Sequence, residues 1–92
     1  MTDESAGTLP TAVTKAYDVL LWLINHVSKF PRSHRFVLGD RIESRMLAVL
    51  ESLVLAAYTR DKKSHLQQAN GHVQVLRLLV RAGKDLGFTS TK

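Results

Sequence analysis

Apolar residues recur at alternating intervals of three and four along three segments of this 92-residue chain. This spacing places side chains on one face of an α-helix, and no segment shows the strict alternation of a half-buried strand. The first segment carries two such lines, Val13, Tyr17, Leu20, Ile24, Val27 and Ala16, Leu23, Phe30. The second carries Leu38, Ile42, Met46, Val49, Leu53 and Ala56, and the third carries Leu66, Ala69, Val73, Leu76 and Val80. We expect helices near residues 11–30, 34–59 and 63–86.

Helix breakers and caps divide the segments. Pro31 ends the first helix near Phe30, and Ser33 is expected to cap the second. Lys84 and Gly87 form the stop signal of the third. Gly39 inside the second helix costs about 1 kcal/mol relative to Ala, which predicts close packing against another backbone. Because short connections between long helices imply antiparallel neighbours, the predicted fold is an all-α, up-down helical bundle.

Length and composition set the organisation. Residues 1–9 are expected to form a disordered tail and residues 10–92 a single helical-bundle domain. The chain has no cysteine, which favours a reducing cytoplasm. No apolar run is long enough to span a membrane. The second helix has apolar residues on more than one side, so we expect either a missing fourth helix or burial between subunits.

The net charge of +5 is unevenly distributed. Residues 1–30 hold two Lys and three acids, a net of −1, whereas residues 31–92 hold eleven Lys and Arg and five acids, a net of +6. Such a basic field attracts polyanions, of which nucleic acid is the most common. The alternative is a solvated surface that maintains solubility.

The third segment carries a polar stripe without an acid. Arg32, Arg35 and Arg41 lie close to Pro31, in the hinge between the first and second helices. The stripe comprises Lys63, Gln67, Asn70, Gln74, Arg77, Arg81 and Lys84. Lys and Arg neutralise phosphates, and amides hydrogen-bond sugars or bases. We predict nucleic-acid contacts at Arg32, Arg35, Lys63, Arg77, Arg81 and Lys84, with an ordinary solvated face as the alternative. For Asp40 and Arg41 we predict structural ion pairing, within or between subunits.

Catalytic and metal-binding patterns are missing from the sequence. His26, His34, His65 and His72 contain no pair at the i,i+4 spacing of a helical metal site. No nucleophile motif accompanies them. Trp22 and Tyr17 are expected in the core or in a subunit interface. We therefore expect a binding protein, with no cofactor, metal or small-molecule substrate, rather than an enzyme.

Four segments resemble the accessory variability determinant (Avd) proteins of diversity-generating retroelements and the related proteins encoded in intervening sequences of ribosomal RNA genes. They are Tyr17-Asp-Val-Leu-Leu-Trp-Leu-Ile, Lys29-Phe-Pro-Arg, Arg35-Phe-Val-Leu-Gly-Asp-Arg-Ile and Lys84-Asp-Leu-Gly. The similarity covers roughly residues 13–88. It implies a four-helix bundle that assembles as a basic homopentameric barrel, without enzymatic activity, and that partners a reverse transcriptase and its template RNA or cDNA.

The chain differs from that family in one respect, because it stops where the fourth helix of the family would begin. Either the chain is a short member of the family or it is a fragment or shortened gene product, and its assembly stays open. The resemblance also leaves two functions open. One is a retroelement accessory protein that binds reverse transcriptase and nucleic acid. The other is a stand-alone oligomeric scaffold with no nucleic-acid role.

Overall fold

The computed structural model describes residues 10–88, which form three long helices joined by a compact hinge and a short turn. Helix α2 spans Thr11–Val27, α4 spans Asp40–Tyr58 and α5 spans Lys62–Asp85. Between α2 and α4 lie the short helix α3, Arg32–His34, and the π-helical turn η1, Arg35–Gly39. The described residues contain no strand, so the all-α prediction is confirmed. The expectation for residues 1–9 lies outside the described residues.

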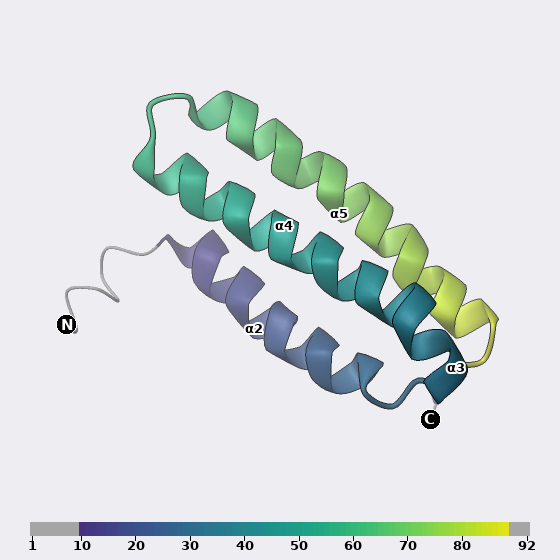
Figure 1. Ribbon diagram of the computed structural model, residues 1–92. Helices are drawn as coiled ribbons and strands as arrows, with labels where there is room; N and C mark the ends of the chain where they lie inside the picture. The colour runs from purple at the N-terminus through teal and green to yellow at the C-terminus, as the bar shows by residue number, and fades with distance from the viewer. Residues whose placement is uncertain (1–9, 89–92) are drawn as a thin grey trace.

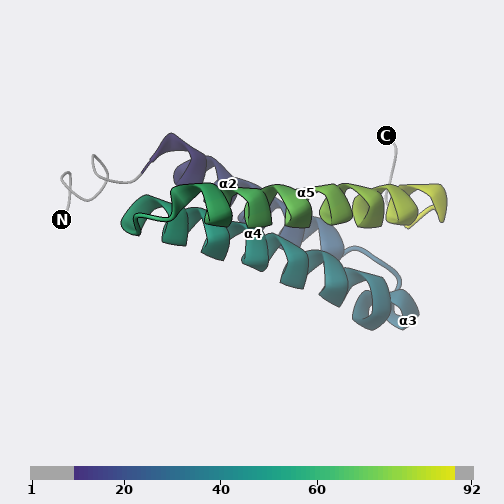
Figure 2. The same ribbon diagram turned by 90° about the horizontal axis from the view of Figure 1, so that it is seen from above.

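Helix α4 is the centre of the structure. It packs against both α2 and α5, and successive long helices run in opposite directions (Figure 1). Seen from above, α4 and α5 lie close near the turn that joins them and diverge toward the hinge (Figure 2). Phe30 and Leu38 pack against α5 at Gly83, where an added Cβ would lie 3.2 Å from the Phe30 ring and 3.5 Å from Leu38.

The hinge differs from the sequence expectation in two respects. Helix α2 ends at Val27 rather than near residue 30, and Phe30 closes a turn by donating its N–H to the Val27 carbonyl at 2.9 Å. Ser33 does not cap the second helical segment, because that segment already begins at Arg32 and Pro31 occupies the N-cap position. The Pro31 carbonyl accepts hydrogen bonds from the N–H groups of residues 34 and 35.

Gly39 allows α2 to approach the hinge closely. A Cβ at this position would lie 2.6 Å from Cγ1 of Val27, closer than van der Waals contact permits. Close packing at Gly39 was expected against another backbone, and the structure corrects this: the neighbour is a valine side chain. Because Val27 is buried and β-branched, it has little freedom to move away.

Helix α5 has well-formed caps at both ends. The Asp61 carboxylate accepts a hydrogen bond from the Ser64 N–H at 3.3 Å. At the other end, Gly87 has a φ of 79°, and the N–H groups of Phe88 and Gly87 donate to the carbonyls of Gly83 and Lys84 at 2.9 and 3.0 Å. This is a Schellman motif, which uses glycine because it adopts a positive φ without strain. The predicted stop signal is confirmed.

The core draws on both predicted apolar lines of α2. Three residues of the first line, Val13, Leu20 and Val27, are buried, and so are all three of the second, Ala16, Leu23 and Phe30. Tyr17 and Ile24, which the sequence placed on the same face, are exposed. Helix α4 is the main partner of α2, and Leu76 of α5 joins the same core cluster. Both flanks of α2 stay exposed. The predicted line from Leu38 of η1 to Ala56 of α4 is buried or half-buried.

Candidate nucleic-acid interface

The predicted basic residues of α5 lie on its surface. Lys63, Arg77, Arg81 and Lys84 are all exposed, as are Gln67, Asn70 and Gln74 between them. The stripe exists as a continuous face because residues three and four apart lie on one side of a helix. The Gln74 amide donates to Oδ1 of Asn70 at 3.3 Å, which orders the polar middle of the stripe.

One acid borders the basic end of the stripe. Arg81 Nε lies 3.7 Å from Asp85 Oδ2, and both side chains are largely exposed. Exposed i,i+4 pairs contribute little to stability, so this pair mainly orients the Arg81 guanidinium. Arg77 and Lys84 have no ion-pair partner among residues 10–88.

The two hinge arginines have different environments. Arg32 is exposed on α3. Arg35 is half-buried, and its Nη2 donates to the carbonyls of Ser28 at 3.0 Å and Phe30 at 3.4 Å. Because these carbonyls follow the last turn of α2, Arg35 satisfies acceptors that the helix leaves unpaired. The chain thus gives Arg35 a structural contact, whereas Arg32 stays accessible to a ligand.

The predicted ion pairing of Asp40 and Arg41 is not formed within the described residues. Both side chains are exposed, and the one ion pair within residues 10–88 joins Arg81 to Asp85. Pairing between subunits remains a prediction. A neighbouring arginine does link two helices: Arg45 Nη1 of α4 lies 3.0 Å from His72 Nδ1 of α5. Since a guanidinium only donates, His72 accepts through Nδ1.

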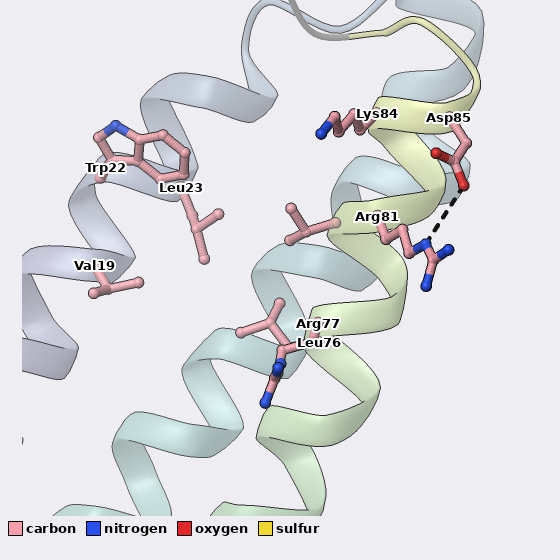
Figure 3. Close-up of a pocket in the computed structure, with 9 residues that line it drawn as sticks. Val19, Trp22, Leu23, Leu76, Arg77, Arg81, Lys84 and Asp85 are labelled. Atoms are coloured by element: carbon pink, nitrogen blue, oxygen red, sulfur yellow. Dashed lines mark ion pairs between the residues drawn. The ribbon is translucent and has the colours of Figure 1, made fainter. Parts of the chain in front are cut away.

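A groove of about 620 Å³ lies between α2 and α5, beside the basic stripe (Figure 3). Val19 and Trp22 form its α2 wall, and Leu23 extends from α2 toward the gap. The other wall belongs to α5. Its lining residues are Leu76, Arg77, Val80, Arg81, Lys84 and Asp85. Lys84 reaches toward the groove, whereas Arg81 turns to Asp85 (Figure 3).

Trp22 was expected in the core or in a subunit interface. The core placement is wrong, because 57% of the Trp22 surface is exposed, and burial in a subunit interface stays a prediction. Its indole stacks on the imidazole of His26, with ring centroids 4.6 Å apart and planes inclined by 14°. A signal was present in the spacing: Trp22 follows the buried Leu20 by two residues, about 200° around the helix, and so cannot share its face.

A second exposed apolar surface, the outer apolar face, lies on the opposite flank of α2. It comprises the exposed Tyr17, Leu21 and Ile24 of α2 and, on α4, the exposed Leu47 with the half-buried Leu50 and Val54. Tyr17 lines a hollow with Leu50 and Val54. Contiguous exposed apolar surface of this kind marks interaction sites.

The described residues show no arrangement suited to a metal ion, since no three His, Asp or Glu side chains come together within residues 10–88. None of the helices in this range is long and apolar enough to cross a membrane.

Comparison with known proteins identifies the relationship that the resemblance predicted. A model of the bAvd-like family matches residues 11–92. The chain belongs to the bAvd-like family. Avd-like proteins are generally non-catalytic accessory proteins. No curated protein and no solved structure matches the chain.

Proposed function

We propose that this bAvd-like protein is a non-enzymatic, homo-oligomeric accessory protein of a diversity-generating retroelement that binds nucleic acid through the basic face of α5. The observation that carries the proposal is the exposed stripe of Lys63, Arg77, Arg81 and Lys84 in a chain of this family. Together with Arg32, these cations supply the phosphate contacts, which carry affinity without sequence information. Binding is therefore sequence-tolerant and weakens steeply as salt rises.

Charge reversal on α5 tests the nucleic-acid role. The double variant Arg77→Glu/Arg81→Glu removes two cations and adds two anions on an exposed face, so helicity is retained. The matched control is Lys15→Glu/Arg60→Glu, which changes the net charge equally at two exposed sites outside the stripe. We expect the first variant to lose binding to RNA and DNA at low salt and the control to retain most of it. Equal binding by both variants and the parent would favour the scaffold function instead.

The outer apolar face supports homo-oligomerisation, with five subunits if the chain assembles as the Avd resemblance implies. Three side chains of α2 and three of α4 form this face, and burying it between subunits removes apolar surface from water. Leu21→Glu introduces a charge into the face and is expected to release monomers. Leu78→Glu is the matched control, because Leu78 is exposed on α5 outside the face. Light scattering that shows a monomeric parent at micromolar concentration would reject the assembly.

The reverse-transcriptase partnership rests on the family relationship. A reverse transcriptase gene and a repeated variable region beside the gene for this protein would support it. Co-purification of the two proteins, retained after nuclease treatment, is the direct test. A chain that binds neither the reverse transcriptase nor nucleic acid acts as a stand-alone scaffold.

A further inference from the structure

Arg45 and His72 connect α4 to α5 through their side chains. Nη1 of Arg45 lies 3.0 Å from Nδ1 of His72, and both side chains are half-buried. The other hydrogen bond between two side chains in residues 10–88 joins Gln74 to Asn70 within α5. The arginine–histidine contact is therefore the one hydrogen bond in this range that links side chains of two different helices.

Both residues lie among buried apolar neighbours. Val49, one turn after Arg45 on α4, and Ala69, one turn before His72 on α5, are both buried. In such surroundings a polar contact is stronger than in water, and an unpaired charge is more costly. Neither residue lines the groove between α2 and α5, and neither belongs to the outer apolar face. The contact therefore does not depend on what covers those two surfaces.

The charges around the pair are positive. Arg41 lies one turn before Arg45 on the same side of α4, whereas Glu43 is two residues from Arg45, about 200° around the helix. Residues 68–76 of α5 include no ionisable side chain besides His72, and the residues that α2 contributes to the core are all apolar. In the described part of the chain, no carboxylate oxygen lies within 4.0 Å of either group. A proton on His72 would have no anion to offset its charge.

We propose that His72 forms an acid-sensitive contact, which holds α5 against α4 while the imidazole is neutral and is lost when the imidazole takes up a proton. A guanidinium carries donors and no acceptor, so the contact exists only while Nδ1 of His72 has a free lone pair. Protonation turns an N–H toward the guanidinium and sets two like charges against each other. This contact is separate from the proposed nucleic-acid binding, although α5 also carries the basic stripe.

The direction of the pH dependence follows from this chemistry. The contact stabilises only the folded chain, and only with a neutral His72, whereas an unfolded chain takes up the proton without meeting Arg45. Acid therefore favours the unfolded chain. Because imidazoles gain their proton between about pH 8 and about pH 5, the contribution of the contact is complete at the upper end of this range and is lost toward the lower end.

The protonation state of His72 is the first measurement. Long-range ¹H–¹⁵N NMR spectra of the full chain report which ring nitrogen carries the proton, and the signals that disappear in His72→Gln assign the ring. At about pH 8 we expect a proton on Nε2 and none on Nδ1, because Nδ1 is the acceptor. A proton on Nδ1 at this pH would overturn the proposal.

Urea unfolding followed by circular dichroism measures the effect on folding, at about pH 8 and about pH 5.5 and at one protein concentration. His72→Gln supplies an amide oxygen that can accept a hydrogen bond at either pH, and Arg45→Met removes the donor but keeps a long side chain. His34→Gln is the matched control, because His34 is an exposed histidine outside the pair. Acid should raise the unfolding equilibrium constant of the parent and the control about fivefold more than that of the other two variants.

The outcomes separate this contact from other sources of acid sensitivity. Equal acid responses in the parent, His72→Gln and Arg45→Met would overturn the proposal. It also fails if light scattering shows that acid dissociates the parent and His72→Gln alike, because subunit contacts then carry the response. If a variant does not fold, the parent decides: protonation of His72 must coincide with faster hydrogen exchange of the α5 amides around it, corrected for the intrinsic effect of pH. Protonation without this change contradicts the proposal.

Discussion

Adding one methyl group at Gly39 tests the packing of the hinge. In Gly39→Ala, the new Cβ would lie 2.6 Å from Cγ1 of Val27. Val27 is 2% exposed, and its branched side chain has one preferred rotamer in a helix, so relief requires movement of the backbone. Overpacking of this kind costs about 1–3 kcal/mol.

Helix propensity acts in the opposite direction and must be removed from the comparison. Ala is favoured over Gly inside a helix by about 1 kcal/mol, and Gly39 already has helical dihedral angles, φ −60° and ψ −45°. Gly71, within α5, is the matched position, because a Cβ there would meet nothing within 4 Å. Gly71→Ala should therefore stabilise the protein by about 1 kcal/mol. The difference between the two variants isolates the packing cost, about 1–3 kcal/mol.

The assay is equilibrium urea unfolding followed by circular dichroism, with all variants at one protein concentration, because assembly shifts apparent stability. A double-mutant cycle with Val27→Ala isolates the contact itself. Shortening Val27 removes the obstructing methyl group, so Gly39→Ala should cost less in that background. The reasoning is refuted if Gly39→Ala stabilises the protein as much as Gly71→Ala does, or if the cycle shows no coupling.

Two further substitutions test the caps of α5. Asp61→Ala removes the acceptor of the Ser64 N–H and should lower the free energy of unfolding by about 1 kcal/mol. Asp61→Asn should retain most of the stability. Equal losses in both variants in urea unfolding would argue against the cap. Gly87→Ala places a Cβ on a residue in the left-handed conformation, φ 79°. Nothing within 4 Å obstructs the new atom, so the expected loss of about 1–2 kcal/mol in the free energy of unfolding comes from the backbone alone. A thermal midpoint equal to that of the parent would show that the Schellman turn does not stabilise the helix end.

Much of the fold was predictable from local patterns. The buried line of α4 follows from the spacing of its apolar residues. The stop of α5 at Lys84 and Gly87 follows from the conformational freedom of glycine. Both can be read directly from the sequence. The π-helical turn at Arg35–Gly39 was not predictable, because it depends on how α2 meets the hinge. The role of Arg35 was missed for the same reason, since its acceptors at Ser28 and Phe30 come within reach only after the chain turns at Pro31.

The candidate site also has one part that the sequence predicted and one part that it did not. The basic stripe was predictable because its residues lie on one helix, where intervals of three and four determine a face. The core placement of Trp22 was wrong because apolar character on α2 extends around most of the helix, and only the arrangement of the partner helices decides which part is buried.

By itself, the sequence determined three amphipathic helices and their order, the stop of α5, a basic α5 face and membership of the bAvd-like family. All of these depend on residues close together in the chain. The tertiary structure decided which part of the apolar surface of α2 is covered, mainly by α4. That choice buries Leu20 and Leu23 and leaves Trp22 beside Arg77 and Lys84 in an open groove. The physical reason is that burial depends on which surfaces meet in space, and a helix with several apolar flanks does not specify which of them its neighbour will cover.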